Sequence, residues 1–326
     1  MAPHSREPEA VSTADVVLLA GPTASGKSAL ALDLAQRFGG VVINADAMQV
    51  YREMSILTAR PDAAAEARAP HRLYGVLSAT EACSAGLWRA RAVEEIGAAH
   101  AAGKLPIVVG GTGLYLKALT EGLAPVPPVP PEIRERVRAR LEAIGPASLH
   151  AELALRDPVM GGRLRPSDSQ RLARATEVLE ATGRSLADWQ ADVPPGEGFR
   201  VLTLMLAPPR DVLHAACDAR FRAMVASGAL DEAEAVRALG LDPALPASRA
   251  LGLRELMRHL EGEIRLEEAI GLAQAATRQY AKRQMTWFRN QLRDPAIFTE
   301  QYSERVRQKS FANIEHWQLT GSAAND

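Results

Sequence analysis

A glycine-rich turn that follows a short apolar run is the feature that most constrains the fold of this 326-residue chain. Residues 16–20 are continuously apolar, and residues 21–28 read Gly-Pro-Thr-Ala-Ser-Gly-Lys-Ser. This spacing, between a buried strand and a helix, is typical of a phosphate-binding loop. We therefore predict a polyphosphate site at 21–28, carried by a strand–loop–helix unit.

Each residue type in this loop has a physical role in phosphate binding. The two glycines let successive backbone N–H groups face a phosphate, and the following helix adds partial positive charge at its N-terminus. Lys27 neutralises phosphate oxygens, and the Ser28 hydroxyl can hold Mg²⁺, the cofactor that we expect. The predicted phosphate-binding residues are Gly21, Pro22, Thr23, Ala24, Ser25, Gly26, Lys27 and Ser28. The motif does not say which phosphate compound binds, or whether a nucleotide is hydrolysed.

Strand-like and helical segments alternate along the first third of the chain. Strands are predicted at 41–44, near 73–77 and at 105–109, and helices at 28–38 and 85–102. Continuous apolar strands separated by helices indicate a parallel sheet covered on both faces. We therefore assign the chain to the α/β class, with a P-loop NTPase-like parallel sheet.

The pattern changes after a proline-rich segment at 124–131. Residues 132–189 contain arginine-rich amphipathic stretches without a strand pattern, whereas 200–206 again reads as a strand that completes the sheet. This order predicts an all-helical domain inserted into the α/β domain. The predicted divisions are a loose N-terminal tail (1–14), the catalytic core (15–124 and 199–308), the helical insertion (125–198) and a loosely ordered C-terminal tail (309–326).

Two polar turns follow predicted strands. Asp46 comes shortly after the second strand, and Gly110-Gly111-Thr112 follows the strand at 105–109. Ligands of open α/β sheets bind at the carboxyl ends of strands, so Asp46 and Thr112 should reach the cleft; the alternative for Asp46 is a turn cap. The strand at 105–109 lacks the terminal acid with which hydrolases hold Mg²⁺ and orient water. This favours a transferase with a diphosphate leaving group, or a small-molecule kinase, over a hydrolase.

Composition limits the partners. The 38 Lys and Arg against 39 Asp and Glu give a formal charge of −1, so RNA binding would need a local basic surface. No apolar run approaches the roughly 18 residues of a membrane span, and two cysteines cannot build a four-cysteine zinc site. We expect a cytoplasmic protein without membrane contact. A candidate basic surface is the acid-free segment 277–293, with Arg278, Lys282, Arg283, Arg289 and Arg293.

Six motifs together resemble the tRNA dimethylallyltransferase (tRNA isopentenyltransferase) family. They occur in the family's order and span about 21–290 of the chain. The motifs lie at 21–28, at 46–51 (Asp-Ala-Met-Gln-Val-Tyr), at 58–61 (Thr-Ala-Arg-Pro), at 110–115 (Gly-Gly-Thr-Gly-Leu-Tyr), at 168–178 and at 281–289 (Ala-Lys-Arg-Gln-Met-Thr-Trp-Phe-Arg). The chain departs from the family's common pattern at Ala47, where a serine is usual, and at Leu57 and Arg60, where glycine and lysine often stand.

The resemblance implies transfer of a dimethylallyl group from dimethylallyl diphosphate to N6 of the adenosine 3′ of the tRNA anticodon. It implies that Asp46 is the base, that Thr112 and Arg134 contact the substrate, and that Arg220 lies near the diphosphate. The implied catalytic residues are Asp46, Lys27, Thr112 and Arg220. The implied partners are dimethylallyl diphosphate and the anticodon stem-loop, and we expect a monomer.

The predicted tRNA-binding residues come from the resemblance and from the basic segment 277–293. They are Asp46, Ala47, Met48, Gln49, Thr112, Arg134, Gln170, Arg171, Leu172, Ala173, Arg174, Lys282 and Arg283. Two other functions stay open on the residues alone. One is a P-loop small-molecule kinase in which Asp46 orients a hydroxyl, and the other is an RNA-binding module without catalysis.

Overall fold

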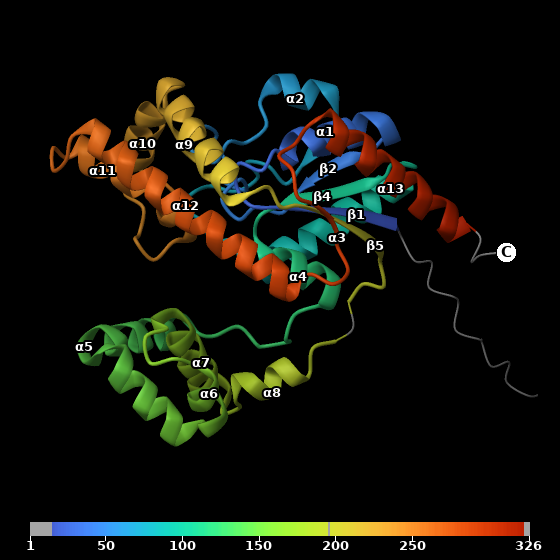
Figure 1. Ribbon diagram of the computed structural model, residues 1–326. Helices are drawn as coiled ribbons and strands as arrows, with labels where there is room; N and C mark the ends of the chain where they lie inside the picture. The colour runs from blue at the N-terminus through green and yellow to red at the C-terminus, as the bar shows by residue number, and fades with distance from the viewer. Residues whose placement is uncertain (1–14, 195, 323–326) are drawn as a thin grey trace, which may run out of the picture. The chain divides into compact units, whose positions relative to one another are not determined.

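The chain forms two compact units (Figure 1). A computed structural model describes residues 15–194 and 196–322; the predicted N-terminal tail at 1–14 lies outside the described residues. The first unit takes in the chain up to Thr120 and again from Glu197, and the second unit is Glu121–Gly196. The predicted division into a discontinuous core and an insertion places its boundaries close to these.

A six-stranded parallel sheet organises the first unit, with strand order β3-β2-β4-β1-β5-β6. The strands are β1 (Asp15–Ala20), β2 (Val41–Asn44), β3 (His71–Arg72), β4 (Pro106–Gly110), β5 (Arg200–Leu206) and β6 (Ala296–Phe298). The register pairs Ala20 with Gly110 and Met205, and Asn44 with Val109. The turns after β1, β2, β4 and β5 therefore begin at the same edge of the sheet.

Helices cover both faces of this sheet (Figure 1). The helices on these faces are α1 (Lys27–Phe38), α2 (Ala63–Arg68), α3 (Ala85–Ala101), α4 (Gly113–Glu121) and α13 (Glu304–Ser322). The other helices of the unit gather toward the carboxyl ends of the strands; they are α9 (Arg210–Ala226), α10 (Ala229–Ala238), the 3₁₀-helix η1 (Pro246–Arg249), α11 (Leu253–Leu260) and α12 (Leu266–Gln291). Because side chains alternate along a strand, Val17 and Leu19 of β1 join the core that includes α1 and α13. Val16 and Leu18 join the opposite core, which includes α3 and α4.

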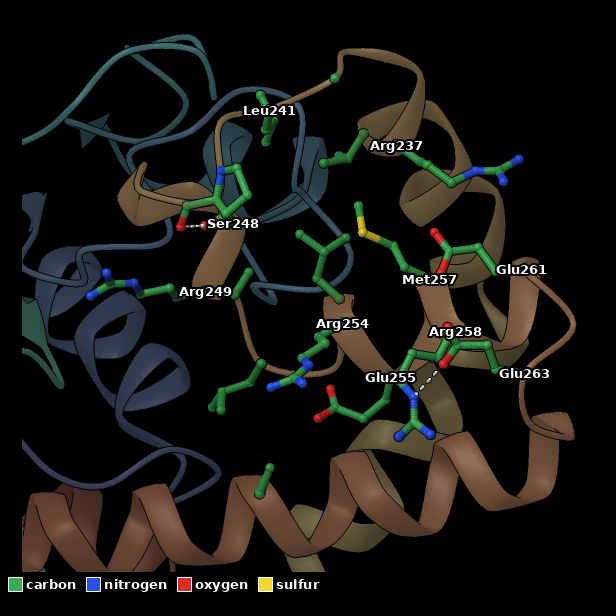
Figure 2. Close-up of a pocket in the computed structure, with 17 residues that line it drawn as sticks. Arg237, Leu241, Ser248, Arg249, Arg254, Glu255, Met257, Arg258, Glu261 and Glu263 are labelled. Atoms are coloured by element: carbon green, nitrogen blue, oxygen red, sulfur yellow. Dashed lines mark hydrogen bonds and ion pairs between the residues drawn. The ribbon is translucent and has the colours of Figure 1, made fainter. Parts of the chain in front are cut away.

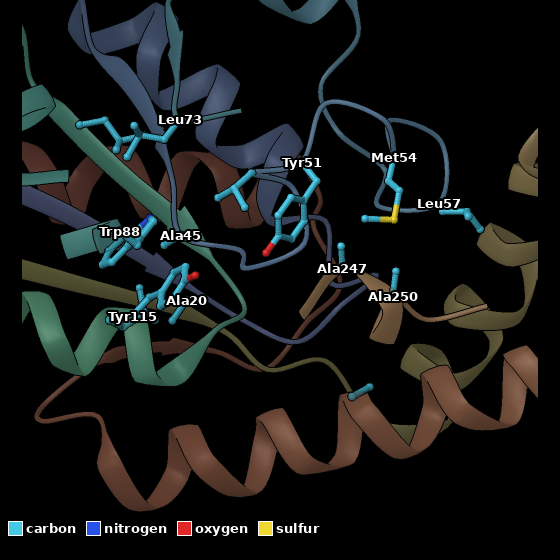
Figure 3. Close-up of a cluster of buried hydrophobic side chains, with 14 of the residues drawn as sticks. Ala20, Ala45, Tyr51, Met54, Leu57, Leu73, Trp88, Tyr115, Ala247 and Ala250 are labelled. Carbon is cyan, nitrogen blue, oxygen red and sulfur yellow. The ribbon is translucent and has the colours of Figure 1, made fainter. Parts of the chain in front are cut away.

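The core on the α3 and α4 face reaches the carboxyl ends of the strands (Figure 3). Trp88 of α3 stacks on Tyr115 of α4, with ring centroids 4.5 Å apart. The Trp88 indole N–H donates to the Asn44 carbonyl at 2.7 Å. This buried contact fixes the end of β2, from which the turn containing Asp46 departs.

The second unit is a small helical cluster with its own core. Its helices are α5 (Pro131–Arg156), α6 (Pro158–Arg163), α7 (Ser169–Thr182) and α8 (Leu186–Ala191). Leu149 and Leu153 of α5 pack with Met160 and Leu172. α5 is kinked where Gly145 takes a positive φ of 76° immediately before Pro146, because proline cannot donate an N–H to the helix.

Two strand predictions need correction. The strand expected near 73–77 is instead β3 at His71–Arg72, because Leu73 (φ 64°) and Gly75 (φ 59°) leave the extended conformation. Leu77 makes only an isolated bridge to Tyr51. The sheet is also not completed by β5, since β6 pairs with β5 beyond it. The short β6 was missed because three residues show no recognisable alternation.

The predicted loose tail from 309 onward is also wrong for most of its length. Residues 309–322 belong to α13, and only 323–326 lie outside the described residues. Val306, Ser310 and Ile314 recur every four residues along one side of α13 and are buried, Ile314 completely. Packing on the sheet therefore stabilises a helix whose overall polarity concealed it. Among the described residues, no helix is both long and apolar enough to cross a membrane.

Replacing Ile314 with alanine should test this packing. Ile314 is 0% exposed, whereas Leu319, farther along the same helix, is 72% exposed. We expect Ile314→Ala to lower the free energy of unfolding by about 2–5 kcal/mol, because it leaves a cavity in a core. Leu319→Ala, the control, should change it by less than about 0.5 kcal/mol. Equal effects in chemical denaturation would show that α13 does not pack on the sheet.

Candidate active site

The predicted phosphate-binding loop connects β1 to α1. Ala24 and Gly26 have positive φ angles of 62° and 89°, so the loop turns back on itself between them. Ser25 is fully buried, and its N–H makes a long hydrogen bond of 3.3 Å to the Pro22 carbonyl. Lys27 Nζ also donates to the Pro22 carbonyl, at 3.2 Å. Alternating backbone conformations of this kind form a concave surface of N–H groups that suits an anion.

A buried glutamine joins this loop to the second glycine turn. Gln284 of α12 accepts the Thr23 N–H on its Oε1 at 2.8 Å, and its Nε2 donates to the Gly111 carbonyl at 2.9 Å. A side chain on Gly111 would overlap the Gln284 amide. Glycine is therefore required after β4 because the two turns meet across a single amide group.

Two cations lie beside the loop. Arg220 of α9 donates to the Thr23 hydroxyl. Burial lowers the pKa of Lys27 to about 8, the nearby Asp46 charge opposes this, and Arg220 adds to the lowering. Burial also lowers the pKa of Arg220, with Cys217 and Asp46 opposing. An arginine nonetheless stays protonated, so the cluster is prepared for an anion that would relieve its repulsion.

Asp46 is held in a turn by two of its neighbours in the sequence. Its backbone N–H donates to Asn44 Oδ1 at 2.8 Å, and Asn44 Nδ2 donates back to the Asp46 carbonyl at 3.0 Å. Asp46 Oδ1 accepts the Met48 N–H at 2.9 Å. The alternative prediction, that Asp46 caps a turn, is therefore partly right, but Asp46 uses only one of its carboxylate oxygens as the cap. Asp46 Oδ2 has no hydrogen-bond partner among the described residues.

Thr112 links the ends of β2 and β4. Its N–H donates to the Ala45 carbonyl at 3.2 Å, and its hydroxyl accepts the Ala47 N–H at 2.9 Å. The Tyr280 hydroxyl interacts with Thr112 and Gln284, and its pKa is raised, mainly by burial and then by the Asp46 charge. The structure therefore brings together Lys27, Asp46, Thr112 and Arg220, the four predicted catalytic residues.

The remaining residues of the 46–49 turn have different surroundings. Ala47 and Met48 are half-buried against the core of the α3 and α4 face. Gln49 donates both amide hydrogens to backbone carbonyls, those of Thr58 and Ala59. Gln49 therefore orders the 58–59 loop through its amide nitrogen, which leaves only its Oε1 to accept from a ligand.

Ser28, the residue predicted to bind Mg²⁺, suits a metal ion that is held mainly by the phosphates of a bound substrate. Ser28 is exposed in the first turn of α1, beside the loop. Among the described residues, no group of three or more His, Cys, Asp or Glu side chains could hold a metal ion. Mg²⁺ retains waters and is commonly bound through substrate phosphates rather than by a complete protein cage, so this donor set suits it.

In the helical unit, the predicted RNA-binding stretch of α7 is only partly available. Gln170 and Arg171 are exposed and Arg174 is half-buried, whereas Leu172 and Ala173 are buried. Arg171 is ion-paired to Asp168 at 3.6 Å, and Arg174 to Glu177 at 3.9 Å. Only the backbone of those two apolar residues could approach RNA.

The exposed arginines of α5 fall into two groups. Arg136 and Arg140 are ion-paired to Glu180 and Glu152, at 2.8 Å each. Arg134 is exposed and has no ion-pair partner within the residues that the structure describes. Its charge is therefore available to a ligand, whereas the charges of the paired arginines are already neutralised.

The segment 277–293 contributes less free charge than its composition indicates. Arg278 is ion-paired to Asp218 at 2.5 Å, whereas Lys282 and Arg283 are exposed on α12. Phe288 is buried in the core. One side of α12 therefore packs, and its exposed side carries the two predicted RNA-binding cations.

Sequence reasoning missed Asn44, Cys217, Tyr280 and Gln284 as parts of the site. Gln284 had a usable signal, because it lies between Ala281 and Phe288 in the apolar repeat of α12 and is only 4% exposed. A polar residue in such a position needs a buried partner. Cys217, whose thiol lies 3.9 Å from the Thr23 carbonyl, had no local signal.

A separate groove of about 810 Å³ lies between α10, η1, α11 and α12 (Figure 2). Arginines and glutamates line it, and Arg258 pairs with Glu263 at 2.9 Å. None of the predicted site residues lines this groove. The chemistry of the chain is therefore assigned to the loop cluster rather than to this groove.

Known proteins match nearly the whole chain. The model of the IPP transferase family matches residues 49–291. The tRNA dimethylallyltransferase of Rhodospirillum rubrum is 56% identical over 307 residues, which cover 94% of each chain. That of Nitrobacter hamburgensis is 58% identical over 284 residues, 86% of this chain and 89% of the relative.

Solved structures agree with this match. A tRNA isopentenylpyrophosphate transferase from Bacillus halodurans has a TM-score of 0.68 at 30% identity, and the alignment covers 95% of this chain and 100% of that one. A eukaryotic dimethylallyltransferase acting on tRNA has a TM-score of 0.73 at 29% identity, over 85% and 70%. These relatives support the resemblance over the kinase alternative. The chain belongs to the tRNA dimethylallyltransferase family.

Proposed function

We propose that this chain transfers a dimethylallyl group from dimethylallyl diphosphate to N6 of the adenosine 3′ of the anticodon in tRNA, giving N6-isopentenyladenosine. The proposal rests on one observation. The phosphate-binding loop at 21–28, which forms a cradle for an anion, and the partly free carboxylate of Asp46 lie at the same edge of the sheet. Lys27 and Arg220 lie beside the loop, and the Asp46 charge acts on both. A diphosphate leaving group needs cations that stabilise its negative charge, and an amine that loses a proton needs a base that accepts it.

The reaction exchanges one bond for another. The C1–O bond of dimethylallyl diphosphate breaks, its electron pair leaves with the diphosphate, and the adenine N6 forms the new bond to C1. Lys27 and Arg220 stabilise the negative charge that develops on the leaving group. N6 must then lose a proton, which Asp46 Oδ2 accepts while Oδ1 retains the Met48 N–H.

Thr112 and Gln284 keep these groups in place during transfer. Thr112 holds the Ala47 N–H and so fixes the turn that presents Asp46. Gln284 fixes the cradle relative to the second glycine turn. Mg²⁺ would be held by the Ser28 hydroxyl and phosphate oxygens, and it would neutralise charge on the diphosphate.

Recognition of tRNA is assigned to polar and cationic side chains at the surface of the two units. Arg134, Gln170, Arg171 and Arg174 of the helical unit, and Lys282 and Arg283 of α12, are the proposed contacts. Phosphate contacts of this kind supply affinity and position rather than sequence reading.

Incubation with labelled dimethylallyl diphosphate, Mg²⁺ and bulk tRNA tests the function. We expect label in tRNA, at the adenosine 3′ of the anticodon after nuclease digestion and mass spectrometry. Phosphorylation of a small molecule by ATP without label transfer would favour a kinase instead. Binding of tRNA with neither reaction would leave an RNA-binding module.

Asp46→Asn separates the base from the turn cap. Asparagine can still accept the Met48 N–H, so the turn should persist, but it cannot take the N6 proton. We expect the single-turnover rate to fall by roughly 10²–10⁴, as for a positioned general base. Asp62→Asn is the matched control, since Asp62 caps α2 through the Ala65 N–H and lies outside the site. A variant at Asp46 as fast as the wild type would remove Asp46 from proton transfer.

The pKa of Lys27 predicts a pH dependence for substrate binding. Lys27 is protonated below its pKa of about 8 and attracts the diphosphate, and it loses this charge in the free protein as the pH rises above 8. The Kd of dimethylallyl diphosphate, measured by calorimetry, should therefore rise toward about tenfold per pH unit above the pKa. Lys27→Arg retains its charge and should flatten this profile. A wild-type Kd that does not change from about pH 7 to 9.5 would contradict the assignment.

Replacing Arg171 and Arg174 together with alanine tests the RNA surface of the helical unit. The logarithmic salt dependence of tRNA binding should become shallower by about 0.7–0.9 for each phosphate that the variant no longer binds. The affinity for dimethylallyl diphosphate should not change. The matched control replaces Arg136 and Arg140, whose ion pairs with Glu180 and Glu152, at 2.8 Å each, are shorter than the pairs of Arg171 with Asp168 and of Arg174 with Glu177, at 3.6 and 3.9 Å. If both double variants have the wild-type slope, RNA binds elsewhere.

A further inference from the structure

The segment between β6 and α13 packs against the phosphate-binding loop. Gln301 Nε2 donates to the Ala24 carbonyl at 2.8 Å. The next residue, Tyr302, lies so close to Gly26 that a side chain on Gly26 would overlap it, and its hydroxyl bonds to Asp33 of α1. This segment follows residue 291, where the family match ends.

The carbonyl that Gln301 holds belongs to a backbone unit with a rarely used conformation. Ala24 has a φ of 62°, which a residue with a side chain seldom adopts. In a trans peptide the carbonyl and the next N–H point in opposite directions. Because Gln301 holds the Ala24 carbonyl on one side, the Ser25 N–H points to the other.

That other side is the phosphate side of the loop. The Ser25 N–H and Lys27 Nζ both donate to the Pro22 carbonyl, at 3.3 and 3.2 Å. The Ser25 N–H therefore faces the same space as the ammonium group that meets the leaving group. Its long bond to Pro22 is weak and can be exchanged for a phosphate oxygen. A flipped peptide would instead present the Ala24 carbonyl, a partial negative charge, to the anion.

The donor and acceptor atoms of the Gln301 amide determine how this side chain is oriented. Its amide nitrogen is the only part that can donate to a carbonyl, and a rotated amide would place two oxygens against each other. Gln301 Oε1 is buried and has no hydrogen-bond partner in the described part of the chain. The Ala24 carbonyl is thus the contact that orients this side chain.

We propose that Gln301 is a positioning residue for the diphosphate: its amide holds the Ala24 carbonyl outward, so that the Ser25 N–H faces the phosphate oxygens. This inference rests on the proposed function, because it assigns the loop's anion as the diphosphate of the prenyl donor. Gln301 acts through the loop and touches no substrate. It should therefore affect diphosphate affinity whether or not a prenyl group is attached.

Calorimetry with two probes, inorganic pyrophosphate and dimethylallyl diphosphate, tests this on the full chain with Mg²⁺ and without tRNA. Gln301→Met preserves side-chain length and removes the donor. We expect its Kd to rise about tenfold or more for both probes, the effect of misplacing one donor to a charged group. The affinity for tRNA should stay within about twofold, since RNA contacts are ionic and lie elsewhere.

The matched control is Gln308→Met on α13, where the glutamine bonds only Glu304 and is exposed. It should leave both affinities unchanged. Thermal unfolding of both variants separates a folding defect from a binding defect, and Gln301→Ala serves if Gln301→Met does not fold. A folded Gln301 variant that binds both probes like the wild type overturns the proposal. A wild-type chain that binds neither probe overturns the proposed function instead.

Discussion

The buried amide of Gln284 is the contact on which the site depends. It accepts the Thr23 N–H and donates to the Gly111 carbonyl, and so joins the turns that follow β1 and β4. Parallel register alone brings these turns to one edge of the sheet, but it leaves their backbones free to move relative to each other. One amide supplies both a donor and an acceptor, so it can satisfy one backbone N–H and one backbone carbonyl at the same time.

This arrangement keeps unlike charges close without neutralising them in a direct ion pair. Lys27 and Arg220 are desolvated beside the loop, and Asp46 is near enough to oppose the loss of the Lys27 proton. The Asp46 carboxylate accepts one backbone N–H of its own turn, that of Met48, on one of its two oxygens. Cations for a leaving group and a carboxylate for a departing proton can therefore coexist within one site, because backbone groups hold Lys27 and Asp46 and the Thr23 hydroxyl holds Arg220, without a salt bridge among them.

Much of the first unit could be predicted from the sequence, because its strands and helices follow from patterns over a few neighbouring residues. The strands predicted at 41–44 and 200–206 match β2 and β5, and α3 ends at Ala101, within one residue of the predicted end. Errors occurred where local signals were weak or misleading. Leu73 interrupts an apolar run by adopting a positive φ, and α13 is polar on average although Ile314 is completely buried. Both depend on packing against segments far away in the sequence.

The sequence by itself determined the phosphate-binding loop, the parallel α/β architecture and the residues that resemble the family, because spacing over a few residues specifies turns and buried strands. Only the tertiary structure decided what fixes that loop. Gln284 is 261 residues from Thr23, and Gln301 is 277 residues from Ala24. No periodicity relates positions so far apart. Their contacts arise because α12 shares a buried core with β1, and because β6, which precedes Gln301, pairs with β5 next to β1. Such packing depends on the whole core.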